Sequence, residues 1–186
     1  MKLSTKDMAL VSIFTALTSI GAIISIPIGQ VPITMQSVFV ILSGLILGPK
    51  LGALSQLIYV ILGLIGLPVF ANFTGGLHSI MKPSFGFIIG FIFASYAAGR
   101  IAHSKSIISK SKIWVASAVS TAVIYIFGLP YMYYIINVVM TEKISSALVF
   151  KTGFLLFLPG DILKLIIASV ISIKTIPILR SNRNLI

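Results

Sequence analysis

The stretch from 157 to 167 carries two charges in an apolar run: Phe157-Leu158-Pro159-Gly160-Asp161-Ile162-Leu163-Lys164-Leu165-Ile166-Ile167. Asp161 is one of 3 acidic residues in a chain of 186. A charge at membrane depth costs about 2.5–3.5 kcal/mol on insertion scales, so such a residue usually serves a function. Residues three apart share a helix face, so Asp161 and Lys164 can meet in one cavity. We interpret them as a binding site; a structural ion pair that locks two helices together is the alternative.

The composition indicates an integral membrane protein. Hydrophobic residues make up 58% of the chain and charged residues 9%, against about 25% charged residues in a soluble domain. No charged residue occurs from Met8 to Pro49, and a soluble fold could not bury that much apolar surface. We therefore predict a single all-α membrane domain over 1–186. The absence of cysteine excludes disulfides, thiolate metal sites and cysteine nucleophiles.

Hydropathy divides the chain into six predicted transmembrane helices. Their approximate bounds are 8–26, 33–48, 51–67, 84–102, 113–136 and 155–177. Several are shorter than the roughly 20 residues of a typical span, which indicates tilt or shielding by neighbouring helices.

Basic residues are distributed unequally between the two ends of these helices. With the N-terminus inside, ten would be cytoplasmic: Lys2, Lys6, Lys50, Arg100, Lys105, Lys110, Lys112, Lys174, Arg180 and Arg183. Three would be outside: Lys82, Lys143 and Lys151. This positive-inside bias predicts that both termini are cytoplasmic. It also accounts for the net charge of +11 without nucleic acid, since no basic face carries interleaved aromatic residues.

The predicted outer connections are uncharged and contain helix breakers. The segments 26–32 and 66–76 both contain glycine and proline among apolar residues. Long apolar loops on one face suit a lid over a ligand, and non-helical backbone at membrane depth is tolerated where it lines a cavity. We predict that both loops and the Asp161–Lys164 face form one outward-facing pocket. Pro159-Gly160 would open the helix just before the charged pair.

The sequence predicts no catalytic residue and no metal site. It lacks a glycine-rich loop ending in Gly-Lys-Ser/Thr, so the chain does not hydrolyse ATP by the usual phosphate cradle. His78 and His103 have no second ligand nearby and are interpreted as solvated loop residues, and Asp7 as a helix N-terminal charge. An intramembrane enzyme or a channel stays as the alternative class, although no serine has a base within reach and the spans lack a continuous polar stripe.

The first predicted helix has small residues at helical spacing. Ser12 and Ala16 are four apart, and Thr15 and Ser19 repeat that spacing on an adjacent face. Small residues at this spacing let two helices approach closely in lipid. The pattern fits either contact with another protein or ordinary internal packing.

Motifs spread over nearly the whole chain are similar to those of one transport family. Gly-Leu-Pro-Val-Phe-Ala fills 66–71, Gly75-Gly76 follows, and Pro159-Gly160-Asp161 is followed by Lys164. The turn Gly-Leu-Ile-Leu-Gly-Pro-Lys-Leu-Gly fills 44–52. Together with six short spans, these motifs resemble the BioY family, the biotin-specific substrate-binding S component of energy-coupling factor (ECF) transporters.

The resemblance implies a substrate-binding subunit in the plasma membrane of a prokaryote, without a cofactor. It implies that biotin is captured from outside, and that a transmembrane coupling protein and two cytoplasmic ATPases are the partners. A homo-oligomer that works alone is left open. Ser12 and Ala16 fall where the family carries an Ala-x-x-x-Ala contact surface for the coupling protein. Serine departs from that pattern but is small enough to preserve the close approach.

The resemblance and the residue chemistry together give the expected ligand contacts. Asp161 would accept a hydrogen bond from a ureido N–H of biotin, and Lys164 would donate to the ureido carbonyl or balance the carboxylate. Apolar residues of the loop over 66–76 would cover the rings. The further ligand-binding residues expected are Gln36, Phe70, Asn72, Thr74, Gly75, Gly76 and Phe87.

The segment before the fourth predicted helix departs from the family pattern. Lys82-Pro83-Ser84-Phe85-Gly86-Phe87 stands where family members often read Gly-Pro-Thr/Ser-Gly-Gly-Tyr, and Ile88 stands where they can carry arginine. Lys82 or Lys164 would supply the missing positive charge. The departures leave lipoate, a pimelate-like acid or another vitamin as alternative ligands.

Overall fold

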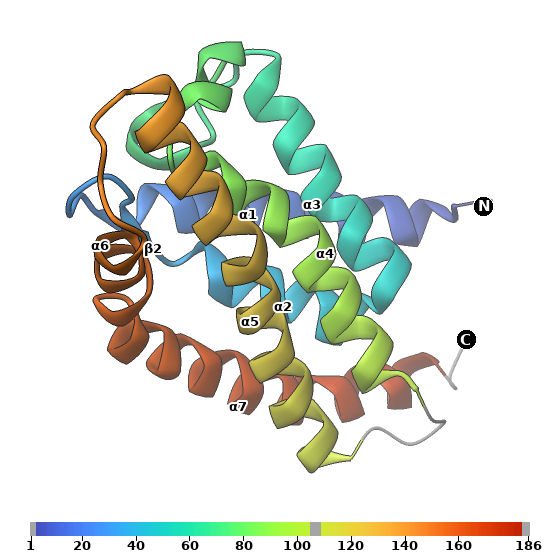
Figure 1. The fold of residues 1–186 in the computed structure, drawn as a ribbon. Coiled ribbons are helices and arrows are strands. Elements are labelled where there is room, and N and C mark those ends of the chain that lie inside the picture. Colours follow the sequence, from blue (N-terminus) through green and yellow to red (C-terminus); the bar gives the residue numbers. More distant parts are fainter. Residues whose placement is uncertain (1–2, 105–108, 184–186) are drawn as a thin grey trace.

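A computed structural model describes residues 3–104 and 109–183 as a bundle of helices (Figure 1). The six long helices are α1 (Thr5–Ile23), α2 (Gln36–Leu47), α3 (Pro49–Leu64), α4 (Phe85–Ala102), α5 (Lys110–Tyr134) and α7 (Leu158–Arg183). They match the six predicted spans, so the predicted all-α fold is confirmed. Lys2 and Lys105, both predicted to be cytoplasmic, lie outside the described residues.

Short elements connect the long helices on the side of the predicted outer loops. They are the antiparallel strands β1 (Ser25–Ile26) and β2 (Ile33–Thr34), the 3-10 turns η1 (Ala71–Phe73) and η2 (Leu77–Met81), the π turns η3 (Ile135–Val139) and η4 (Lys151–Leu155), and the helix α6 (Ser146–Phe150). The sequence analysis did not predict α6 or either π turn. They carry the chain from the end of α5 to the start of α7.

The first helix begins earlier than the hydropathy predicts, because a capping box starts it. The Ser4 hydroxyl accepts a hydrogen bond from the Asp7 backbone N–H at 3.1 Å, and the Asp7 carboxylate accepts one from the Ser4 N–H at 3.1 Å. Two otherwise unpaired N–H groups are satisfied in this way. The prediction that Asp7 is a helix N-terminal charge is confirmed.

Helices α2 and α3 are shorter, at 12 and 16 residues, and follow each other through a tight turn. In the described part of the chain, four segments are long and apolar enough to cross a membrane: Thr5–Ile23, Phe85–Ala102, Lys110–Val139 and Ser146–Leu179. Gly48, with φ of 84°, turns the chain between α2 and α3, a backbone angle that favours glycine. A Cβ at Gly44 would overlap the Ser95 carbonyl of α4, and one at Gly99 would overlap the Pro49 backbone.

Hydrogen bonds between buried polar side chains join four of the helices. Gln56 of α3 donates to Thr18 of α1 at 3.2 Å and to Ser43 of α2 at 3.1 Å. Ser43 in turn lies 2.8 Å from Ser95 of α4. All four side chains have 0% exposure. In lipid, where apolar burial between helices contributes little, such bonds and close packing hold a bundle together.

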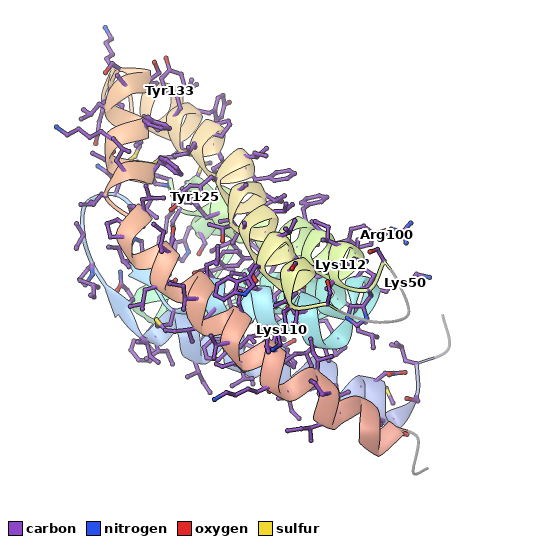
Figure 2. The ribbon with its side chains drawn as sticks, turned by 90° about the horizontal axis from the view of Figure 1, so that it is seen from below. Lys50, Arg100, Lys110, Lys112, Tyr125 and Tyr133 are labelled. Atoms are coloured by element: carbon purple, nitrogen blue, oxygen red, sulfur yellow. The ribbon has the colours of Figure 1, made fainter. Side chains whose placement is uncertain are left out.

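The two ends of the bundle differ in charge. Figure 2 places Lys50, Arg100 and Lys112 towards one end and Tyr133 at the other. The start of α1 and the end of α7 lie on the side of these basic residues in Figure 2. The predicted cytoplasmic charges that the figure labels therefore gather away from the β1–β2 loop and the α5–α6 connection.

His103 does not lie free in solvent, as the sequence analysis expected. It is the residue at which α4 ends, and its Nε2 lies 2.9 Å from the Leu45 carbonyl oxygen of α2. The close approach of α2 and α4 at Gly44 brings the ring within reach of that carbonyl. His103 is thus a partly buried link between two helices, whereas His78 is exposed on η2.

Candidate functional site

A cavity of about 350 Å³ opens between the outer loops and the helices beneath them. The β1–β2 loop contributes Val31, the loop after α3 contributes Phe70 and Asn72, and the helices contribute the floor. The apolar floor and walls include Phe87, Ile88, Phe91, Ile124 and Phe157. The volume lies in the range of about 300–1,000 Å³ that is usual for small-molecule sites.

Asp161 and Lys164 both line this cavity and bind each other. The Lys164 ammonium donates to Oδ1 of Asp161 at 2.7 Å, and the two side chains have 8% and 12% exposure respectively. They lie in the first turns of α7, directly after the bend at Leu156 and Phe157. Pro159 is in the first turn, a position that proline tolerates because its missing N–H would have no helical partner there. The helix opening predicted at Pro159-Gly160 is not found there, because both residues are helical; the turn lies just before them, at 156–157.

Tyr125 of α5 completes this cluster and was missed by the sequence analysis. Its hydroxyl donates to Oδ2 of Asp161, so each carboxylate oxygen has a different donor. Edge-to-face contacts with Phe154 at 4.8 Å and Phe87 at 6.0 Å hold the ring. A tyrosine in the middle of a predicted span was the available signal, since tyrosine hydroxyls in apolar surroundings usually find a partner.

Gln36 also lines the cavity and belongs to a second polar cluster. It has 3% exposure and donates to the Tyr59 hydroxyl at 2.6 Å, while its carbonyl accepts from Thr34 at 2.9 Å. The Tyr59 hydroxyl donates in turn to the Val69 carbonyl at 3.2 Å. Gln36 therefore connects α2 and α3 to the loop that covers the cavity.

The loop after α3 folds over the cavity as the sequence analysis predicted. Phe70 and Thr74 exchange backbone hydrogen bonds of 2.9 and 3.3 Å, which close a small loop that carries Asn72. The Phe70 ring packs so closely on Gly63 of α3 that a Cβ there would overlap it. Phe70, Asn72 and Thr74 all line the cavity.

Gly75 and Gly76 do not line the cavity but shape this loop. A Cβ at Gly75 would overlap the Leu67 carbonyl, and Gly76 has φ of 90°. The Gly76 N–H donates to the Gly63 carbonyl at 2.7 Å, which ties the end of the loop back to α3. Of the residues predicted for ligand binding, these two are placed beside the cavity and the other seven in its wall.

A smaller groove of about 210 Å³ lies between α5 and α7. Ala118 and Ala122 of α5 face Ile162 and Leu165 of α7 across it, and Tyr125, Thr121 and Asp161 line this groove as well as the main cavity. Ile162 has 52% exposure, as expected of a side chain that faces lipid. The Tyr125–Asp161 pair therefore lies between the cavity and this groove.

Comparison with known proteins identifies the family of this chain. The family model described as "BioY family" matches residues 1–181. The chain belongs to the BioY family. A probable biotin transporter BioY from Pyrococcus horikoshii is 41% identical over 91% of this chain and 96% of its own length. A probable biotin transporter BioY from Lysinibacillus sphaericus is 36% identical over 97% and 91%, and the biotin transporter BioY of Thermotoga maritima 40% identical over 87% and 90%.

A solved BioY-like structure agrees with the fold. It is described as the S-component for biotin from an ECF-type ABC transporter, and it superposes with a TM-score of 0.68 at 28% identity, over 92% of this chain and 93% of its own. As a BioY protein, the chain is a multi-pass protein of a prokaryotic cell membrane and a transport protein rather than an enzyme.

The small residues of α1 separate into two faces in this BioY chain. Ser12 and Ala16 are exposed, next to exposed Ile13 and Ile20. Thr15 instead has 5% exposure, and its hydroxyl lies 2.9 Å from the Ser55 carbonyl of α3. Thr15 thus packs internally, whereas Ser12 and Ala16 form a surface that no other part of the described chain covers.

Proposed function

We propose that this chain captures biotin from outside the cell as the S component of an ECF-type transporter. The observation that carries the proposal is the Tyr125–Asp161–Lys164 cluster in the wall of an otherwise largely apolar cavity. The names of the relatives and of the solved structure support biotin as the ligand.

The cluster offers what the ureido ring of biotin needs. The ring has two N–H donors and one carbonyl acceptor. Each Asp161 oxygen has one donor in the described part of the chain, which leaves lone pairs for a ureido N–H in a charge-assisted bond. Lys164 has three ammonium hydrogens and uses one on Asp161, so it can also donate to the ureido carbonyl. Phe70 and Phe87 would pack against the thiophane ring and the aliphatic tail.

Energy for uptake would come from partner chains, a coupling protein and two ATPase subunits. The exposed Ser12–Ala16 face of α1 is the surface proposed for the coupling protein, because small side chains allow a second helix to approach closely. The basic end of the bundle, with both termini, would face the cytoplasm.

Titration calorimetry tests the ligand. Protein purified in detergent from biotin-free cultures should bind biotin tightly at one site per chain. Asp161→Asn should weaken binding by about tenfold or more, since a hydrogen bond to a charged group contributes roughly 1.5–3 kcal/mol. Absence of heat with the ligand-free protein, or full affinity in Asp161→Asn, would contradict the assignment.

Single cysteines test the orientation, because the natural chain has none. A membrane-impermeant thiol reagent should label Lys143→Cys in intact cells and should not label Lys112→Cys until the cells are opened. The reverse pattern would invert the proposed topology.

A further inference from the structure

Among the described residues, one positive charge in the cavity wall has no neutralising partner. Its charged side chains are Asp161, Lys164 and Lys82. The Lys164 ammonium is bound to Asp161 at 2.7 Å, so these two charges compensate each other. Lys82 makes no side-chain hydrogen bond or ion pair with any residue of the described ranges 3–104 and 109–183.

A buried hydroxyl without a partner lies one turn before Lys82. Ser79 has 2% exposure, lines the same cavity, and its Oγ has no hydrogen-bond partner within the described chain. Leaving such a group unsatisfied costs about 1–3 kcal/mol. Ser37 of α2, also in the cavity wall, has a buried Oγ in the same condition. Both hydroxyls thus lie just beneath the cavity surface without a partner, and rotation of the Ser79 side chain would let its hydroxyl donate to a ligand oxygen.

The backbone around these two residues is fixed in place. The Ser79 N–H donates to Gly76 at 3.0 Å, and the Lys82 N–H donates to Ser79 at 3.1 Å. The Tyr131 hydroxyl of α5 donates to the Ile80 carbonyl at 2.6 Å and so anchors the turn. Helix α4 begins three residues after Lys82, at Phe85, and the positive end of its dipole adds to the field there.

We propose that Lys82 and Ser79 form a subsite for the carboxylate of the ligand. This inference rests on the proposed function, and it assigns the end of the cavity that binds the acidic tail of the ligand. The ligand would place its neutral polar ring at Asp161 and Lys164, and its acidic tail at the turn formed by η2 and Lys82. Lys164 is the poorer carboxylate partner, because a ligand anion there would lie against the Asp161 carboxylate.

Two ligands with the same ring and different tails distinguish the contributions of the two ends of the cavity to binding. Biotin and biotinamide differ at the tail, which is an anion in the first and uncharged in the second. The wild-type chain should bind biotin at least about tenfold more tightly than biotinamide, the size expected for one charge-assisted contact. Lys82→Met should reduce that preference to about twofold or less by weakening biotin alone, and Lys82→Arg should keep most of it. Ser79→Ala should reduce it by a smaller factor.

Lys151→Met is the matched control, because Lys151 is an exposed lysine of the outer side that does not line the cavity. It should leave both affinities unchanged. Unchanged binding of biotinamide by Lys82→Met would show that the variant is folded. The subsite is wrong if Lys82→Met keeps the preference or weakens both ligands equally, or if the wild type binds both equally. If the wild type binds neither ligand, the proposed function fails instead.

Discussion

At the residue scale, the carboxylate of Asp161 is held in one orientation by donors from two helices. Lys164 reaches Oδ1 from the next turn of α7, and Tyr125 reaches Oδ2 from α5. A carboxylate fixed by two donors needs no reorganisation when a ligand arrives, so less conformational entropy is lost on binding. Tyr125 is thus a positioning residue for Asp161.

Tyr125→Phe should weaken biotin binding about five- to tenfold, since it removes one hydrogen bond to a charged group while the ring still fills its place. The same change made in Asp161→Asn should have less than about a twofold effect, because the partner that it positions is already altered. Titration calorimetry of the wild type, both single variants and the double variant gives a double-mutant cycle that measures the coupling between Tyr125 and Asp161.

Tyr133→Phe provides the comparison on the same helix. Tyr133 has 44% exposure and lies near the outer end of α5 (Figure 2). Its removal should leave the affinity unchanged. Equal losses from Tyr125→Phe with and without the Asp161 change would contradict a positioning role and indicate a general packing effect.

The charged pair could be predicted from the sequence, whereas a tyrosine within a span indicates a need for a partner but not that the partner is Asp161. Asp161 and Lys164 are close in the chain, so helical spacing alone brings them together. Tyr125 meets Asp161 across 36 positions of sequence, and that contact depends on how α5 packs against α7. Ser79 could not be predicted for the same reason, because its place in the cavity wall depends on tertiary packing and not on a local sequence pattern.

At the element scale, the loop after α3 packs closely on α3 because Gly63 has no side chain. A Cβ at Gly63 would overlap the Phe70 ring, which is part of the cavity wall. Gly63→Ala should therefore displace Phe70 and weaken biotin binding by about three- to tenfold, while overpacking lowers the stability of the fold by roughly 1–3 kcal/mol. Titration calorimetry measures the affinity, and thermal unfolding in detergent measures the stability.

Gly44→Ala should lower the stability without changing the affinity for biotin. Its Cβ would meet the Ser95 carbonyl and Ala98 at the α2–α4 contact, away from the cavity. Stability should fall, with a lower unfolding temperature, while the affinity for biotin stays near that of the wild type. Wild-type affinity in Gly63→Ala would show that the position of Phe70 has no role in binding.

Helix positions were predictable because long apolar segments separated by breakers dominate this sequence. The predicted span over 84–102 and the observed α4 nearly coincide. The elements that were missed, α6 and the two π turns, have no periodicity of their own and form where the chain reverses between α5 and α7. Their conformation is set by packing rather than by local preference.

At the scale of the whole molecule, one face of α1 is left without a partner in the described chain. Ser12→Leu should leave biotin binding by the isolated chain unchanged and should abolish uptake, because the larger side chain would keep the coupling protein from approaching closely. Uptake of labelled biotin by cells that also produce the coupling and ATPase subunits measures the loss. Ile20→Leu, which places leucine on the same helix without adding bulk at a position with 49% exposure, should transport normally. Normal uptake by Ser12→Leu would assign the contact to another surface.

The groove between α5 and α7 gives the binding site a second approach. The Tyr125–Asp161 pair lines both the ligand cavity and this groove, so a compound dissolved in the bilayer could reach the pair from behind. Such a compound would displace the Asp161 carboxylate from its binding orientation without entering the ligand cavity. Because the two binding events are linked through Asp161, a high vitamin concentration would weaken binding of the compound in turn, but a compound for the groove need not resemble the vitamin at all.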